Sequence, residues 1–449
     1  MDGSPFDDRA TMYDGSQVTL RSSLDLFSLP KTDISCAYST QHMPVFPVLS
    51  VKDGENPLEF IVNTETSYVD LSETYLKVAF RVTKDDGKPC ATSDEVAPAN
   101  LMFGLMFKNM EVYLNNKLVS DTSNNYPYVH YIQRLLTMPE SLKNSILKGE
   151  FYYPDATPDA FDLSTTPKPP GFEKRFEASK VSQPVVLLGQ LVGGLFQQQR
   201  WLGPGNELKI VLRRSHPKFC LDSKVTTTNY KVDVKSAVLL VQKKPVTQKV
   251  TEIHRSLLEK NETMKYILNE PVVKTATIPS GVSSYTTEGI IVGRVPKVLC
   301  IGLVSNEAYN GNLTKSPMNF AHNNLSEVTV TWNNAESIES RTIPLNFKTD
   351  TNTAPDDVLE GVLSLQKAVA NDLMWNGISK DNYANGNALV CVELLPNYPE
   401  ALSVIRNGQV KLSLQFRSGT TEPLTLVLFG LYQNILEIDR NRNVIIDRS

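Results

Sequence analysis

The sequence predicts an all-β protein of two tandem antiparallel jelly-roll β-barrels, with one short helical segment in each module. One order of predicted elements occurs twice along the 449 residues. Many short segments alternate apolar and polar residues, which is typical of antiparallel strands with one buried face. Only two segments have helical spacing, which is too few for a parallel sheet whose strands are joined by helices.

The repeated plan is a strand that ends at an Asn-Asn turn, a helical segment, and two further strands. The first helical segment carries Tyr128, Ile132 and Leu135, and the second begins near Thr353 with a capping residue and an early proline. The shared order predicts two copies of one module. The paired strand segments are 110–118 with 328–334, 185–188 with 388–392, and 208–212 with 410–416.

The modules are expected to lie between two tails. We predict an N-terminal arm at residues 1–45, because its composition is irregular and rich in Asp, Ser and Pro. Jelly roll 1 follows at 46–243 and jelly roll 2 at 244–435. The charged C-terminal tail at 436–449 is expected to be exposed. Within jelly roll 1, residues 150–183 are rich in proline without a regular period, so we predict a long loop with a role in interaction.

Composition limits the compartment and the partners. The formal net charge of −4 predicts no strong direct binding of nucleic acid. The five cysteines are widely spaced and odd in number, so we predict reduced thiols in a cytosolic or nuclear setting. The acidic N-terminus lacks the apolar core of a signal peptide. The most apolar segment, 184–196, is too short for a transmembrane segment.

Motifs of catalysis are absent from the sequence. It contains no Walker loop, no GxSxG or HExxH motif, and no closely spaced Cys/His cluster. We therefore predict that the protein is not an enzyme, and we assign no catalytic, cofactor-binding or metal-binding residues and no cofactor.

Several residues could take part in chemistry but have simpler structural interpretations. His130, in the first helical segment, is expected to be a satisfied interfacial histidine rather than a catalytic base. Residues 189–194 contain three glycines but no following Lys-Ser/Thr, so we predict a bend rather than a phosphate cradle. The remaining candidates are acidic pairs expected at turns and helix starts, and basic pairs expected at solvated edges: Asp85-Asp86, Asp356-Asp357, Arg213-Arg214 and Lys243-Lys244.

Five blocks in the first half of the chain carry a family resemblance. They are 24–30, 57–62, 68–78, 112–120 and 125–136. In this order they resemble the hexon-like double jelly-roll major capsid proteins of Polinton/Maverick elements and adintoviruses. The resemblance is strong over residues 24–240. From 245 to 435 it is weaker and lies mostly in the pattern of strands.

The resemblance implies a structural protein of the virion. Three chains would form a homotrimeric capsomer of pseudo-hexameric outline, and capsomers would self-assemble into an icosahedral capsid that encloses double-stranded DNA without strong direct binding. A penton or vertex protein would be a further partner. The chain would be made in the host cytoplasm, with assembly in nucleus or cytoplasm. The family has no catalytic residues to transfer to this chain.

Two other functions suit a jelly roll. A carbohydrate- or receptor-binding protein, like a spike or lectin, would be a monomer or small oligomer with a ligand groove lined by exposed aromatic residues. A cupin-type enzyme would need a His/Glu metal cluster on adjacent strands, and the sequence shows none.

Overall fold

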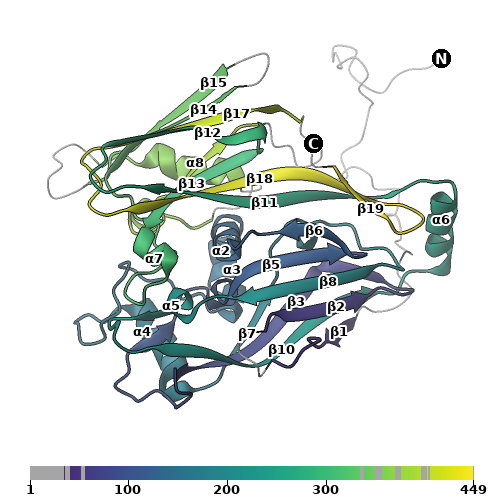
Figure 1. Ribbon diagram of the computed structural model, residues 1–449, viewed down its shortest axis with the longest axis horizontal. Helices are drawn as coiled ribbons and strands as arrows, with labels where there is room; N and C mark the ends of the chain where they lie inside the picture. Colours follow the sequence, from purple (N-terminus) through teal and green to yellow (C-terminus); the bar gives the residue numbers. More distant parts are fainter. Residues whose placement is uncertain are drawn as a thin grey trace, which may run out of the picture.

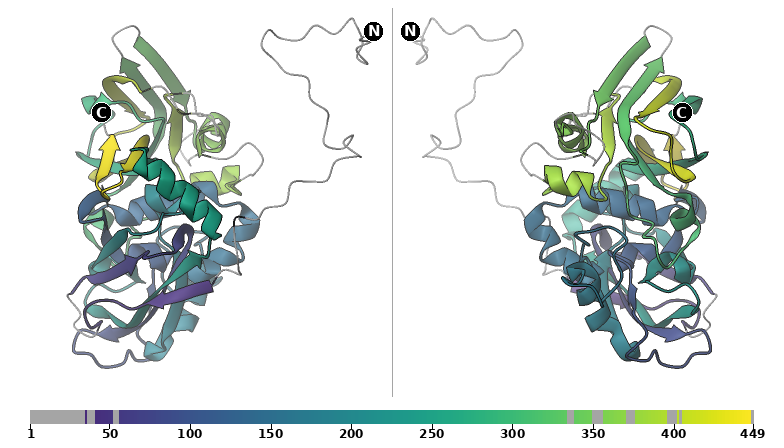
Figure 2. Two further views of the ribbon diagram at one scale, coloured as in Figure 1. Left: turned by 90° about the vertical axis from the view of Figure 1, so that its right-hand side faces the viewer. Right: turned by 90° about the vertical axis from the view of Figure 1, so that its left-hand side faces the viewer.

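The computed structural model describes residues 35, 41–51, 56–333, 338–348, 356–369, 376–395, 402 and 405–447. Two β-rich modules lie one over the other, module 1 in purple to teal and module 2 in green to yellow (Figure 1). The side views show the same two halves, with a helix lying across their junction (Figure 2).

Module 1 contains two four-stranded antiparallel sheets, with strand orders β1-β10-β3-β7 and β2-β8-β5-β6, and a small β4-β9 pair. Its strands are β1 (Gln41–Val45), β2 (Leu58–Asn63), β3 (Tyr68–Lys84), β4 (Val96–Pro98), β5 (Phe107–Leu114), β6 (Lys117–Asp121), β7 (Val185–Gln190), β8 (Glu207–Arg214), β9 (Leu221–Ser223) and β10 (Tyr230–Lys244).

Module 2 repeats this strand order. Its sheets are β11-β18-β13-β16 and β12-β17-β14-β15, and β19 adds to β18. If the β4-β9 pair and β19 are left out, both modules read 1-8-3-6 and 2-7-4-5 in chain order. The strands are β11 (Met264–Ile278), β12 (Ser284–Arg294), β13 (Val298–Ser305), β14 (Leu325–Asn333), β15 (Ile338–Pro344), β16 (Val390–Glu393), β17 (Asn407–Phe416), β18 (Leu424–Ile438) and β19 (Val444–Asp447).

The predicted repeat is confirmed in its order. The paired segments of the sequence fall on equivalent strands, β5 with β14, β7 with β16 and β8 with β17. The first Asn-Asn turn joins β5 to β6, where Asn115 and Asn116 both have positive φ (49° and 64°). Asparagine tolerates that conformation better than most residues, and the right-handed twist of a two-residue hairpin requires it. The second such turn reaches Asn334, outside the described residues.

Helices are more numerous than the two predicted segments. The predicted pair corresponds to α2 and α8, although the start near Thr353 lies outside the described residues. The described helices are α1 (Met102–Leu105), α2 (Tyr126–Thr137), α3 (Glu140–Lys143), α4 (Pro170–Ser179), α5 (Pro217–Cys220), α6 (Gln248–Glu259), α7 (Asn306–Asn310), α8 (Leu359–Val369) and α9 (Lys380–Ala384), with 3₁₀ turns η2 (Ile146–Glu150), η3 (Lys180–Ser182) and η4 (Gly194–Phe196).

Residues 150–183 form a more ordered segment than the predicted loop. Helix α4 starts after Pro169 and buries Phe172 and Phe176, four residues apart, against Phe161. The pair Pro169-Pro170 and this spacing are ordinary signals of a helix start and of a buried helix face. The segment is therefore a packed part of module 1.

Both predicted tails need correction where they are described. Gln41–Val45, placed in the arm, forms β1 and pairs with β10; the rest of the arm, apart from residue 35, lies outside the described residues. In the C-terminal tail, β18 continues to Ile438 and β19 pairs with it. Apolar residues repeat on both sides of the turn, and Leu436, Ile438 and Val444 are buried. The predicted division between the modules at residues 243 and 244 stays a proposal.

The interpretation of all five cysteines as reduced thiols is wrong for one pair. Cys300 on β13 and Cys391 on β16 are register partners, with Cα atoms 4.0 Å apart, and they form a disulfide. Strand pairing brings together residues 91 positions apart, which spacing along the chain could not show. Cys90 and Cys220 are free and buried.

Candidate functional site

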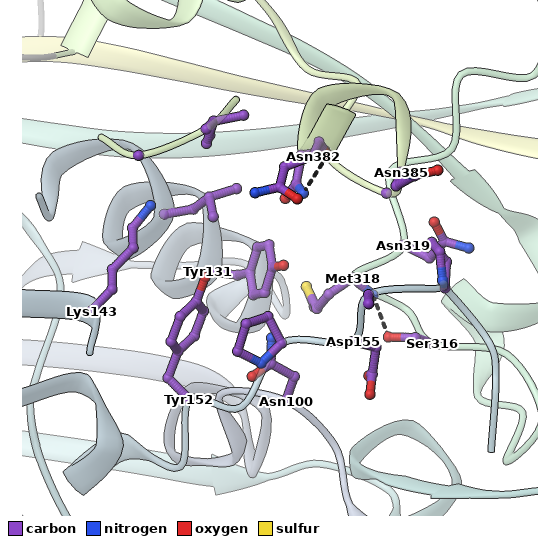
Figure 3. A pocket seen from close by; sticks show the side chains of 18 of the residues that line it. Asn100, Tyr131, Lys143, Tyr152, Asp155, Ser316, Met318, Asn319, Asn382 and Asn385 are labelled. Carbon is purple, nitrogen blue, oxygen red and sulfur yellow. Dashed lines mark hydrogen bonds between the residues drawn. The ribbon is translucent and has the colours of Figure 1, made fainter. Parts of the chain in front are cut away.

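A polar cavity of about 310 Å³ lies between the modules. Figure 3 shows its labelled side chains converging from both sides. Amide and phenol groups dominate the lining: Asn100, Tyr131 and Tyr152 come from module 1, and Asn319, Asn382 and Asn385 come from module 2. Such groups hydrogen-bond to neutral polar ligands. The lining also includes four charged side chains: Glu140, Lys143, Asp155 and Asp159.

The segment after η2 fastens module 1 to module 2 beside this cavity. Asp159 accepts hydrogen bonds from the backbone N of Ser316 and from Nδ2 of Asn319, both at 2.7 Å. Burial raises the pKa of Asp159, although these two donors favour the ionised form. The segment that the sequence predicts to act in interactions thus contacts the other module of its own chain.

A buried cluster of charged side chains also holds the segment that follows η2. The fully buried Arg175 of α4 lies 2.9 Å from Asp155 Oδ2 and 3.0 Å from Asp222 Oδ2, and donates to the carbonyl oxygen of Pro98. Burial raises the pKa of Asp222 to about 7, against the opposing effect of Arg175. Two carboxylates share one guanidinium, so a proton on Asp222 relieves an excess of negative charge.

His130 lies in a second buried cluster, formed by side chains of α2 and Glu150 of η2. Its Nε2 is 3.2 Å from Glu150 Oε2, and Arg134 Nη2 is 3.0 Å from Glu150 Oε1. Burial lowers the pKa of His130, and Glu150 opposes that shift. The histidine ring is fully buried, so its contacts are structural in kind.

The other sequence candidates are dispersed. Gly194 packs so closely on Glu270 that an added Cβ would lie 2.5 Å from its carboxylate oxygen. The negative charge of this carboxylate would repel a phosphate. One residue of each charged pair forms an ion pair: Asp86 with Lys88, Asp356 with Lys380, Arg213 with Glu111, and Lys244 with Asp70. Within the described ranges no three metal-ligating side chains gather, and no helix is long and apolar enough to cross a membrane.

Edge strands expose large apolar side chains that the sequence analysis did not single out. On β15 Ile338 is 76% exposed, and on β12 Val292 is 70% exposed. Beside β1, at the outer edge of module 1, Phe46 is 67% and Val48 is 55% exposed. Unpaired edges with apolar side chains attract further chains unless something covers them.

Comparison with known proteins identifies the fold of the chain but not a sequence family. No family model matches the chain. An uncharacterised protein of Caenorhabditis elegans is 24% identical over 410 residues, which are 88% of this chain and 94% of the relative. A chain in the cryo-EM structure of the Sputnik virophage matches with a TM-score of 0.63 and 13% identity, over 98% of this chain and 94% of that chain.

The crystal structure of the mavirus major capsid protein matches with a TM-score of 0.53 and 10% identity, over 98% of this chain and 96% of that chain. The chain has the double jelly-roll fold of viral major capsid proteins. A PBCV-1 capsid model gives a TM-score of 0.56 at 9% identity, covering 94% of this chain and 99% of that one. The double jelly roll therefore includes nearly the whole chain, and both barrels belong to the shared fold.

Proposed function

We propose that the protein is a viral major capsid protein whose homotrimers are pseudo-hexameric capsomers of an icosahedral shell around double-stranded DNA. The observation that carries the proposal is that one chain holds two barrels of identical strand order side by side. Three such chains provide six similar modules. The match to capsid proteins over at least 94% of the chain supports the same role.

The interface inside the chain provides a template for the interface between chains. On the module 1 side, the β5-β6 edge contacts module 2. Asn115 Nδ2 donates to the carbonyl of Arg442 at 2.9 Å, and Lys117 Nζ to that of Val444 at 2.8 Å. Ser120 also donates to Glu270 of β11. The β11 edge of the first sheet of module 2 thus contacts the β5-β6 edge of the second sheet of module 1.

The equivalent edges, one in each module, lack such a partner within the described chain. The counterpart of β5-β6 is β14-β15, which exposes Ile338, and the counterpart of β11 is β1, followed by the exposed Phe46 and Val48. Repeating the intrachain contact between chains joins the β14-β15 edge of one to the β1 edge of the next. Such a head-to-tail contact closes into a ring of three when the rotation fits.

Several finer points belong to the same proposal. The net charge of −4 supports enclosure of DNA without strong direct contact. The sequence blocks of the first half support an origin among Polinton/Maverick or adintovirus capsid proteins. We propose a non-enzymatic role in the virion, with a vertex protein as a second partner.

Light scattering of the purified protein tests the trimer. We expect three times the 50.0 kDa mass of one chain. Ile338→Lys should shift the mass toward the monomer, because it places a charge in the apolar contact. The matched control is Val225→Lys, at a valine that is 39% exposed outside the strands. The proposal would be contradicted by a wild-type protein that stays monomeric at all concentrations and for which co-expression shows no need of a scaffold protein.

The polar cavity favours one alternative, a carbohydrate-binding jelly roll. Its amide and tyrosine lining resembles the mixture of donors, acceptors and aromatic faces that sugar hydroxyls and rings need. Glycan-array binding by a monomer, abolished by Tyr152→Ala, would favour this function over the capsid role.

A further inference from the structure

A lysine of module 1 is buried against an asparagine of module 2. Lys143, at the end of α3, is 5% exposed, and Asn376 is 2% exposed. The Nζ atom donates to the main-chain oxygen of Asn376 at 2.6 Å, across 233 residues of sequence. Figure 3 shows the Lys143 side chain pointing from the module 1 side of the cavity toward module 2. The amine is thus held beside one particular residue.

The side-chain amide of Asn376 is held in an activated arrangement. Its Oδ1 accepts a hydrogen bond from the backbone N of Ile378 at 3.1 Å, while its Nδ2 is buried without a hydrogen-bond partner in the described part of the chain. A donor on Oδ1 polarises the carbonyl and stabilises negative charge that develops on this oxygen. An unpartnered buried NH₂ group is unfavourable, so its departure is favoured.

The segment that carries Asn376 also packs against Glu140 of α3. Glu140 is one turn before Lys143 on α3 and acts on its charge. Its Cβ packs on Gly377, where an added Cβ would come within 2.8 Å. Gly377 also has a φ of +75°, so glycine is required there on both counts. This close approach holds the start of α3 against the Asn376–Gly377 segment.

We propose that Lys143 and Asn376 form an intramolecular isopeptide bond that joins the two modules covalently. The inference does not depend on the capsid role. The product would close a covalent loop between the barrels, beside the contacts of Asp159 with Ser316 and Asn319.

The reaction needs no oxidant, reductant or other reactant. The lone pair of neutral Nζ attacks Cγ of Asn376, so the Nζ–Cγ bond forms and the Cγ–Nδ2 bond breaks. Nδ2 leaves with that electron pair, takes the proton that Nζ loses, and departs as ammonia. Starting from the ammonium form of lysine, the leaving molecule is ammonium, so charge also balances.

The protonation state of the lysine suits this step. Burial lowers the pKa of Lys143 to about 8, against the opposing effect of Glu140. A useful fraction of the side chain is therefore neutral, and nucleophilic, near neutral pH.

Intact mass spectrometry of the denatured full-length protein tests the bond. We expect the wild type to be lighter than its sequence mass by one ammonia, and peptide mapping should recover a branched peptide that joins Lys143 to Asn376. Lys143→Arg keeps the positive charge but cannot form the amide, so it should have its unmodified sequence mass. Asn376→Ala keeps the main-chain acceptor and removes Cγ carbonyl chemistry, so it serves as the matched control.

Two results would overturn the proposal. One is a wild-type protein at its sequence mass after prolonged incubation at pH 8. The other is deamidation of Asn376 in place of the branched peptide, since an Asn-Gly sequence can lose ammonia to water instead. If either variant failed to fold, peptide mapping of the wild type would still decide, because a succinimide at Asn376-Gly377 has the same mass loss but gives no branched peptide.

Discussion

The second sheets of the two modules have the same strand order but different surroundings. In module 1, the edge strand β2 buries Leu58, Phe60 and Val62 in strict alternation, and the β5-β6 edge meets module 2. In module 2, β15 has one buried residue, Ile343, and exposes Ile338. The two modules thus share their strand order, while the side chains at each sheet edge differ according to what covers that edge. A neighbour inside the chain covers one edge, and a neighbour chain is proposed for the other.

The modules also differ in what their interiors contain. Module 1 buries the cluster of Arg175, Asp155 and Asp222, whereas module 2 has the Cys300–Cys391 disulfide between adjacent strands. Both modules have an apolar core, to which module 1 adds buried charges and module 2 a covalent link between strands.

The largest expected effect comes from removing the charge that module 1 buries. Arg175→Met leaves Asp155 and Asp222 without their cation, and breaking a buried pair in this way costs about 3–5 kcal/mol. Chemical denaturation followed by tyrosine and tryptophan fluorescence should show this loss. The control, Lys411→Met, breaks an exposed pair with Glu288, where about 0–1 kcal/mol is expected. Equal losses of unfolding free energy for the two variants would show that the buried cluster contributes no more to stability than an exposed ion pair.

Matched core truncations ask whether the barrels unfold together. Leu212 on β8 and Leu414 on β17 are both fully buried and lie opposite Met110 and Val328, on equivalent strands. Leu→Ala at either site should cost about 2–5 kcal/mol because it leaves a cavity. If the modules form one cooperative unit, each variant lowers a single calorimetric transition. Two transitions, each sensitive to one variant only, would show independent barrels.

A further expected effect is a pH dependence that arises in module 1. The pKa of Asp222 is raised to about 7 from the ordinary 3.8. Between these values the folded state holds a proton that the unfolded state has released, so this group's contribution to stability falls as pH rises from 4 to 7 and then levels off. Asp222→Asn should flatten this part of the profile of melting temperature against pH. An unchanged slope would assign the dependence to other groups.

Much of the fold could be predicted from sequence because strand alternation is a local signal. The alternation of Leu76, Val78 and Phe80 with polar neighbours predicts β3, and the Asn115-Asn116 turn predicts the hairpin that follows β5. Residues 248–259 carry a local signal of another kind, because Val250, Ile253 and Leu257 have the helical spacing of α6. The sequence analysis did not predict this helix. The tail was misjudged because its charged turn hides the apolar residues of β19.

The candidate site could not be predicted, because its partners are far apart in sequence. The contacts of Asp159 with Asn319 and of Lys143 with Asn376 join positions 160 and 233 residues apart. No periodicity relates such residues, and their types are common on surfaces. The same holds for Cys300 and Cys391, which only strand register brings together.

Each barrel begins and ends in neighbouring strands. Gln41, which opens β1, pairs with Lys243 near the close of β10, and Met264, which opens β11, pairs with Ile438 at the close of β18. Entry and exit thus lie together at one corner, so a second copy of the gene segment can be joined in frame without rethreading either barrel. Only the connector that contains α6 has to be added, and none of that helix's residues is buried. Such an arrangement lets tandem duplication turn one self-associating module into a chain that holds two.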